Sequence, residues 1–513
     1  MKRGLLFFGA PLVALGGALS AAFALAPRAP QETPPAAPAP DAAAPLAPPA
    51  TGSTARHLLL ITLDTVRADK LGCYGYFRDT TPNLDRFAEQ CVRFTRCLSP
   101  IANTTPSHAT MLTGVYPYEH GILDNFFLRP AAEQVALSLK TSPTLRTFAQ
   151  SLAPLGAESA AFVAATPVKK STGLHVGFDT WTEPPPKEAR RTGKEVLADA
   201  LPWLDFADAT PRFGWFHFFD AHGPIKPPKT PPKRYLDLYD TEPRLVEWLR
   251  VRGFPAECAG EHAGTMPTTE ASNLYDGCLR FLDDQLAALF ERLDRYDRRA
   301  DTVVIIVGDH GHGLGQHNLL SHGTAWDEQY HVPLLIRAPG LAPGVVESLV
   351  STIDLLPTAL ALLPGLRDPA FAAQLRGVDV LAEEYAARPV LGQSANDRPT
   401  LTVTTTRWKL QQKHDGRHQL YDLENDPHEL ADVAADHPDV VKQLAKVMNA
   451  DIERQKQRFD LHRRGAVSGG SGIDPQILEE LRALGYTGDE GGDDAPAPPA
   501  GGGGDDAKGG GNR

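Results

Sequence analysis

The chain has 513 residues, of which 42% are hydrophobic, so it can form one large domain and a smaller one around a substantial core. Its formal net charge of −12 argues against a nucleic-acid-binding protein, which normally presents a basic face. Five cysteines without a C-x-x-C pair argue against a disulfide scaffold or a zinc cluster, and we expect most of them to be buried and unpaired.

The first 26 residues are predicted to be an export segment. Lys2 and Arg3 precede an uncharged apolar stretch over residues 4–26, whose end resembles a small-x-small cleavage site. The same stretch is long enough to cross a bilayer as a helix, so a cleaved signal peptide and an uncleaved membrane anchor are both open. Either one places the rest of the chain in the periplasm or another extracytoplasmic space, with possible membrane attachment through residues 4–26.

Two segments have compositions that cannot bury enough apolar surface to fold. Residues 27–53 consist mainly of Pro and Ala, and residues 488–513 are rich in Gly and Asp. We predict a linker and a disordered tail, respectively.

Between these segments, apolar runs alternate with helical patterns. Continuous apolar runs, typical of buried central strands, cover residues 58–63, 160–165, 215–219, 303–307 and 333–336. Helical patterns begin at Pro82 and at Pro106, the second ending at Gly114, and a longer one covers residues 274–293. This alternation predicts an α/β fold for residues 56–395, with a largely parallel central sheet flanked by helices on both faces.

The sequence pattern changes near residue 400. Three short segments, at residues 401–405, 408–411 and 419–423, are expected to form antiparallel strands, and a helix is expected at 440–455. We therefore predict a small C-terminal antiparallel α+β subdomain over residues 396–487.

Three predicted strands end in acidic or histidine residues. Asp64 follows the first strand, Asp220 and His222 follow a later one, and Asp309-His310 follows the next. Ligands of a parallel sheet bind outside the carboxyl ends of its strands, so we expect these groups to converge. Each residue alone could be a turn former, a helix cap or a core histidine, but the set favours a site for a divalent cation, whether Ca, Mg, Mn or Zn.

Thr104 is a candidate nucleophile. If Thr105 caps a helix that begins at Pro106, Thr104 lies just outside a helix N-terminus, where free N–H groups attract an anionic group. A hydroxyl beside a divalent cation can ionise and attack an ester. The segment alone is equally compatible with a plain helix cap.

An ordered set of motifs over residues 56–435 resembles the sulfatase family of the alkaline-phosphatase superfamily. The motifs are Asp64-Thr-Val-Arg-Ala-Asp69, Leu71-Gly-Cys-Tyr-Gly75, Thr81-Pro-Asn-Leu-Asp85, Pro106-Ser-His108, Leu112-Thr-Gly-Val-Tyr-Pro117, His120-Gly121, Asp220-Ala-His-Gly-Pro224, Gly308-Asp-His-Gly311, Leu314-Gly-Gln-His317, His331-Val-Pro-Leu334, Asp354-Leu-Leu-Pro-Thr358, Leu420-Tyr-Asp-Leu423 and Asp426-Pro427. The resemblance implies the sulfatase-like fold and a metal-dependent ester hydrolase.

The resemblance also implies residue roles. Asp64, Asp309 and His310 match the family's metal ligands, and Thr104 stands at the nucleophile position. The three remaining positions are His108, where the family has an arginine that steadies the nucleophile, His222, which contacts the ester or assists the leaving group, and His322, where a substrate oxyanion is contacted.

The chain departs from sulfatases at several positions. Sulfatases oxidise Cys or Ser to formylglycine, whereas the methyl branch of Thr104 would allow only a ketone. His108 replaces the arginine, and Thr65 replaces a second carboxylate ligand. The Lys-x-His substrate motif is not recognisable; the candidates in that region are Lys169, Lys170 and His175. The remaining set is similar to the Thr-dependent phospho-group transferases and phosphodiesterases of the superfamily.

We therefore expect an exported metal-dependent hydrolase or transferase that acts on phosphate esters, phosphodiester or phosphonate, through a covalent Thr104 intermediate. The substrate is expected to be a small-molecule, lipid or glycan ester, selected by the stretch 226–268. Two alternatives stay open: a sulfuric ester hydrolase without formylglycine, and a non-catalytic exported binding protein. A second metal at Asp220 and His222 is also open.

Overall fold

The structure, a computed structural model, describes residues 54–463 and 479–480, with gaps at 126–138, 140–141, 143, 206–207, 223–230, 261–263 and 396–398. The predicted export segment and linker, residues 1–26 and 27–53, and the tail, residues 488–513, lie outside these residues. Within the described ranges, no helix is both long enough and apolar enough to cross a membrane.

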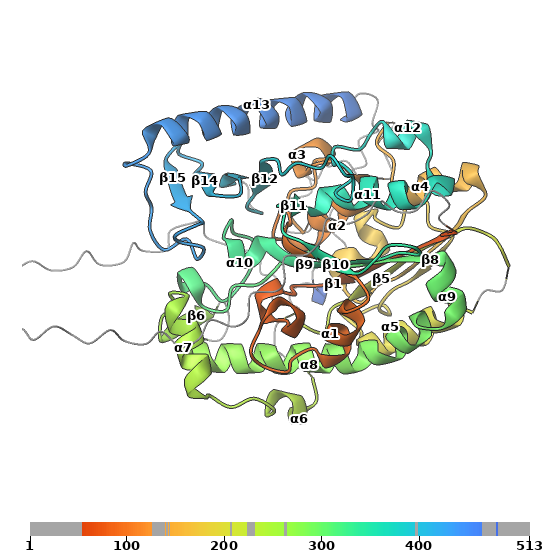
Figure 1. Ribbon diagram of the computed structural model, residues 1–513, viewed down its shortest axis with the longest axis horizontal. Helices are drawn as coiled ribbons and strands as arrows, with labels where there is room; N and C mark the ends of the chain where they lie inside the picture. The colour runs from red at the N-terminus through yellow and green to blue at the C-terminus, as the bar shows by residue number, and fades with distance from the viewer. Residues whose placement is uncertain are drawn as a thin grey trace, which may run out of the picture. The chain divides into compact units, whose positions relative to one another are not determined.

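The centre of the fold is a nine-stranded, mostly parallel sheet with the order β10-β2-β9-β8-β1-β5-β3-β4, in which β11 also pairs with β2 (Figure 1). Its strands are β1 (His57–Leu63), β2 (Val92–Leu98), β3 (Glu158–Phe162), β4 (Thr180–Thr182), β5 (Arg212–Phe218), β8 (Thr302–Gly308), β9 (His331–Arg337), β10 (Gly344–Val346) and β11 (Val350–Ser351). The predicted α/β class is confirmed. Only β9 runs antiparallel to its neighbours β2 and β8.

Helices cover both faces of this sheet because its central strands are apolar on both sides. In β1, Leu58 and Leu60 pack into one core and Leu59, Ile61 and Leu63 into the other. Figure 1 shows α1, α5 and α8 along one face and α2, α4 and α11 along the other. The α-helices are α1 (Pro82–Ala88), α2 (Thr104–Thr113), α3 (Pro117–His120), α4 (Phe148–Leu152), α5 (Gly193–Trp203), α6 (Lys233–Leu236), α7 (Pro243–Val251), α8 (Thr268–Leu293), α9 (Tyr296–Asp301), α10 (Asp327–Tyr330), α11 (Leu355–Leu362), α12 (Pro369–Ala372) and α13 (Pro438–Arg463).

The predicted C-terminal strands form a second, antiparallel sheet with the order β12-β13-β14-β15. Its strands are β12 (Val390–Gln393), β13 (Leu401–Thr404), β14 (Trp408–Gln412) and β15 (His418–Asp422), and α13 contributes Leu444, Met448 and Ile452 to their core. Because β12 pairs with β13, this sheet begins before residue 396, where the sequence placed the boundary. Both sheets belong to one compact unit.

The cysteines and the stretch 226–268 were also singled out from the sequence. All five cysteines are free of disulfides, and four of them are buried while Cys73 is partly buried, as expected. The stretch 226–268 contains helices α6 and α7 and a hairpin of β6 (Glu257–Gly260) and β7 (Gly264–Pro267).

Candidate active site

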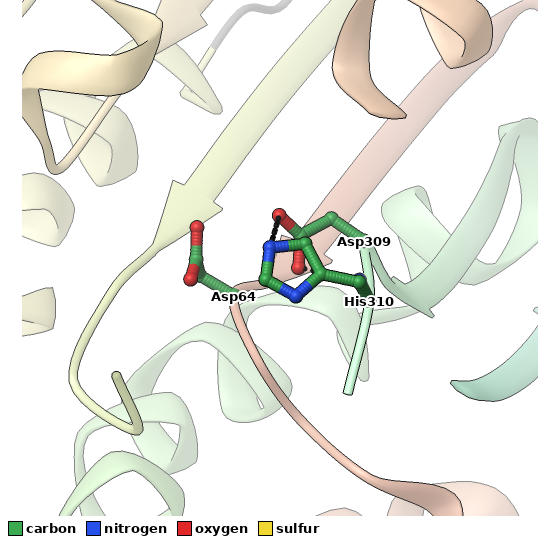
Figure 2. A group of neighbouring side chains, drawn as sticks. All are labelled: Asp64, Asp309 and His310. Carbon is green, nitrogen blue, oxygen red and sulfur yellow. Dashed lines mark hydrogen bonds and ion pairs between the residues drawn. The ribbon is translucent and has the colours of Figure 1, made fainter. Parts of the chain in front are cut away.

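Three predicted metal ligands meet at the carboxyl edge of the central sheet. Leu63 pairs with Gly308 in neighbouring parallel strands, so Asp64 and Asp309 leave β1 and β8 side by side. Ligand atoms of Asp64, Asp309 and His310 all lie within 4.8 Å of one another, and all three residues are buried. Figure 2 shows the two carboxylates and the imidazole gathered at the ends of these strands.

Main-chain hydrogen bonds fix the orientation of Asp309. Its Oδ1 accepts the N–H groups of Thr65 at 3.0 Å and of His310 at 2.7 Å. Its Oδ2 has no hydrogen-bond partner although it is buried, and the same is true of Oδ1 of Asp64. Buried carboxylate oxygens without a donor are costly unless a cation compensates them, so this pair fits a metal ion.

Nε2 of His310 faces the Asp309 carboxylate and is free to bind a metal ion. Its Nδ1 lies 2.9 Å from the carbonyl oxygen of Gly311, to which it donates, so Nε2 carries the lone pair. This Nε2 lies 3.5 Å from Oδ2 of Asp309 and 3.3 Å from Oγ1 of Thr104. Burial lowers the pKa of His310 to about 3, which keeps the imidazole neutral and able to bind a metal.

The two carboxyl groups make the metal-free protein sensitive to pH. Burial raises the pKa of Asp64 to about 8, and burial and the nearby Asp64 charge raise the pKa of Asp309. Since the folded-state pKa values exceed the unfolded value of about 3.8, stability is present at low pH and is lost as pH rises from about 4 through 8. A cation that replaces the shared proton removes this loss.

We therefore expect divalent metal to raise the melting temperature more at pH 8 than at pH 6. The measurement is thermal unfolding with chelator and with Mn²⁺, Mg²⁺, Ca²⁺ or Zn²⁺ at each pH, which also ranks the ions. An equal shift at both pH values, for every ion, would contradict the assignment of Asp64 and Asp309 as ligands.

Thr104 lies at the first residue of α2 rather than before it. The sequence placed Thr105 as the cap and Pro106 as the first helical residue, but Asn103 occupies the cap position and α2 begins at Thr104. The predicted end at Gly114 is correct. Thr104 is fully buried, and its hydroxyl lies 3.3 Å from Nε2 of His310.

His108 contacts the main chain of Thr104. One turn along α2, its Nδ1 donates to the carbonyl oxygen of Thr104 at 2.8 Å, and its Nε2 lies 3.1 Å from Oγ1 of Thr62. Burial lowers the pKa of His108 well below its ordinary value, so it lacks the charge of the arginine that it replaces. It orients the nucleophile through the main chain.

His222 and His322 form a pair of neutral imidazoles. Their Nε2 atoms are 3.3 Å apart, and Nδ1 of His322 lies 3.2 Å from the carbonyl oxygen of Ala102. If His322 donates from Nδ1, then His222 carries its proton on Nε2. Burial lowers the pKa of His322 to about 3 and that of His222 well below its ordinary value. The ring centroid of His322 lies 4.5 Å from that of His310, which places the pair beside the metal ligands.

The sulfatase family profile matches residues 56–366. The chain belongs to the sulfatase family. It is 24% identical to the ulvan-active sulfatase of Formosa agariphila, over 73% of this chain and 76% of that protein. It is 23% identical to the arylsulfatase of Clostridium perfringens, over 79% of this chain and 95% of that protein.

One solved structure with a similar fold is named for a phosphorus ester rather than a sulfate ester. The phosphonate monoester hydrolase of Agrobacterium radiobacter superposes with a TM-score of 0.57 and 20% identity, covering 78% of this chain and 96% of that one. This sulfatase-family protein is accordingly a hydrolase of phosphoric or sulfuric esters. Enzymes of the family generally use a divalent metal ion, and Asp64, Asp309 and His310 form a ligand cluster for one.

The sequence prediction missed His217, which lies inside β5. Its Nδ1 accepts the N–H of Ala164 at 3.2 Å, so Nε2 carries the proton and donates to Oδ2 of Asp64 at 3.3 Å. A lone titratable residue within the apolar run Gly214-Trp-Phe-His-Phe218 was the available signal. His312 was also missed; its ring centroid lies 5.7 Å from that of His322.

Replacing His217 by leucine is expected to weaken metal binding by about 10- to 100-fold, as is usual when a residue orienting a ligand is lost. His217→Gln, which keeps an N–H donor, is expected to lose less. Metal titration of the two purified variants, with activity measured at saturating metal, checks this. Leucine and glutamine variants with native metal affinity would show that the Asp64–His217 contact has no role in binding.

The other residues that the sequence singled out do not join the ligand cluster. Both oxygens of the Asp220 carboxylate accept the N–H of Gly193, at 3.1 and 2.9 Å, and Gln285 donates to one of them. This carboxylate caps α5, which leaves it unsuited to the second metal that the sequence left open. Lys169 bonds Glu480, Lys170 is exposed, and His175 packs edge-on against Trp181.

Proposed function

We propose that this protein is an exported hydrolase or transferase of phosphate esters that uses Thr104 as a covalent nucleophile. The observation that carries the proposal is the position of the Thr104 hydroxyl, which lies 3.3 Å from Nε2 of His310, beside the point where the ligand atoms of Asp64, Asp309 and His310 meet. A threonine here cannot become formylglycine, whereas its oxygen can attack phosphorus directly.

A divalent ion bound by Asp64, Asp309 and His310 would supply positive charge that favours ionisation of a hydroxyl and stabilises charge on the ester oxygens. His108 and the start of α2 orient Thr104, whose hydroxyl faces Nε2 of His310. The N–H of Thr105 donates to Oδ1 of Asn125, that of Ser107 donates to the carbonyl oxygen of Asn103, and Pro106 has none, so the start of α2 contributes its helix dipole rather than a set of free donors.

The first chemical step forms a bond between Oγ1 of Thr104 and phosphorus and breaks the bond from phosphorus to the leaving alcohol. The threonine proton passes to solvent, and the leaving oxygen accepts a hydrogen bond from the Nε2–H of His222, which His322 orients, and takes a proton from solvent. In the second step, water or an acceptor alcohol attacks phosphorus and releases its proton to solvent. The bond from phosphorus to Oγ1 breaks, and Oγ1 takes a proton from solvent, which regenerates Thr104.

A sulfuric ester hydrolase without formylglycine is the second candidate, favoured by the names of the relatives in Formosa agariphila and Clostridium perfringens. The same residues would then attack sulfur or activate water. The two candidates predict different adducts on the same residue.

The deciding experiment is the intact mass of the purified catalytic chain after brief incubation with a phosphodiester, a phosphonate monoester or an aryl sulfate. A phosphoryl-sized adduct that maps to Thr104 supports the phosphoester proposal. Turnover of sulfate esters alone, with no adduct from either phosphorus substrate, favours the second candidate. Binding of these esters with no turnover of any of them contradicts both.

Export is part of the proposal and rests on residues 1–26, whose basic start and apolar stretch resemble a signal segment. The test is fractionation of cells expressing the native chain and one that begins at residue 27. Cytoplasmic retention of the native chain would contradict it.

A further inference from the structure

A buried ion pair lies at the same edge of the central sheet, outside the Asp64 cluster. Nζ of Lys169 lies 2.6 Å from Oε2 of Glu480, and the side chains are only 8% and 3% exposed. Lys169 follows β3 and the short helix η4 (Thr166–Val168), whereas Glu480 comes from far along the chain, beyond α13. The pair therefore joins the catalytic body to a distant segment.

Three donors from the catalytic body converge on this one carboxylate. Besides Lys169, Oγ1 of Thr166 donates to Oε2 of Glu480 at 2.9 Å, and the main-chain N–H of Lys187 donates to Oε1 at 2.9 Å. Lys187 has φ of 71°, a left-handed conformation that is unfavourable for a lysine. Such backbone outliers occur where a main-chain group is aimed at a ligand.

The donors are fixed to one another without Glu480. Nζ of Lys169 also donates to the carbonyl oxygen of Glu188 at 2.8 Å, and the N–H of Thr166 donates to that of Ala189 at 2.9 Å. The cradle is thus built into the catalytic body. If Glu480 left, the Lys169 ammonium would lose its carboxylate partner and keep the carbonyl oxygen of Glu188, which favours replacement of Glu480 by another anion.

The cradle lies beside the proposed reaction centre. Oγ1 of Thr105, the neighbour of Thr104, donates to the carbonyl oxygen of Pro167 in η4 at 2.6 Å. On the other side, Arg190 pairs with Ala165 and donates to the carbonyl oxygen of His222 at 3.3 Å. The same short segments therefore carry the cradle and contact the residues around the candidate nucleophile and leaving-group histidine.

We propose that Thr166, Lys169 and Lys187 form an anion-binding subsite in which Glu480 is the chain's own occupant. Its external ligand is a carboxylate, sulfate or phosphate group, carried by a substrate in addition to the ester that reacts. The role in substrate selection rests on the proposed ester chemistry at Thr104, whereas the exchange of anions in the cradle does not. A polyanionic substrate exchanges with Glu480, and an ester without a second charge leaves Glu480 in place.

The experiment is isothermal titration of the full chain with succinate, a small dianion, at low ionic strength. Glu480→Gln removes the internal competitor and is expected to tighten succinate binding by about tenfold or more, because a tethered group competes at an effective concentration near millimolar. Glu479→Gln is the matched control, since Glu479 is its exposed neighbour and the change in charge is identical. This control is expected to bind succinate like the native chain.

The double variant Lys169→Met with Glu480→Gln removes both charges together, so it leaves no lone buried charge. It is expected to lose the tighter succinate binding of Glu480→Gln. Equal tightening in the Glu479 and Glu480 variants would show a general charge effect and overturn the proposal. So would unchanged binding in Glu480→Gln, or a gain that survives the loss of Lys169. Because binding is measured without turnover, these outcomes are independent of whether Thr104 attacks phosphorus.

Discussion

Replacement of Thr104 by alanine is expected to lower kcat by about 10⁴-fold or more, because removal of a covalent nucleophile leaves only binding and electrostatic stabilisation. Thr104→Ser keeps the hydroxyl beside Asp64 and His310 and is expected to retain measurable turnover and a covalent adduct. The measurement is steady-state hydrolysis of a chromogenic phosphodiester, together with intact mass after quenching.

Thr113→Ala is the matched control for this change. Thr113 lies at the other end of α2, where its hydroxyl donates to the carbonyl oxygen of Ala109, so its loss removes a buried hydroxyl without touching the cluster. We expect native kcat and a destabilisation of about 1 kcal/mol, typical of one lost hydrogen bond. Native turnover in Thr104→Ala would exclude the threonine as nucleophile and point to activated water.

Replacement of Asp309 by asparagine is expected to abolish tight metal binding and activity together. The amide can still accept the N–H groups of Thr65 and His310 through its oxygen, but it cannot supply the second anionic oxygen. Elemental analysis of the dialysed variant is expected to find far less than one metal ion per chain. Turnover should fall by about 10³-fold or more, since electrostatic stabilisation of this kind is worth several kcal/mol.

The same variant should respond to chelation in the opposite way from the native chain. Without metal at pH 8, Asp309→Asn removes one of two buried carboxyl groups whose ionisation opposes folding and is expected to be more stable than the native protein, by on the order of 1–3 kcal/mol. With metal present, the native chain should be the more stable of the two. Calorimetric unfolding with and without chelator tests this reversal. If the same protein were the more stable one under both conditions, Asp309 would not be a metal ligand.

The main elements could be predicted from the sequence because their patterns are local. The apolar runs at residues 58–63 and 303–307 became β1 and β8, and Gly114 ends α2 with φ of 69°. By contrast, β2 was not predicted, because intermediate positions interrupt its buried ones and its seven residues show no long apolar run. The antiparallel direction of β9 depends on its partners and has no signal within its own residues.

The site residues that could be predicted were also those with a local signal in the sequence. Asp64, Asp309 and His310 were found because each directly follows a recognisable strand, and parallel strands bring such residues to one edge. Asp220 follows a strand in the same manner but turns away to bond Gly193 and Gln285, which strand position alone does not reveal. The cradle around Glu480 joins segments separated by 293 and 311 residues, a pairing for which the sequence carries no pattern.

The contact between the N–H of Thr65 and Asp309 spans 244 residues, so the ligand cluster closes a very long loop. We expect such a contact to form after β1 and β8 have paired, because closing a long loop costs chain entropy before the contact is made. An ion that binds only the closed cluster therefore leaves the folding rate almost unchanged and slows unfolding instead. Once loaded, the protein would owe its persistence to a kinetic barrier as much as to its equilibrium stability.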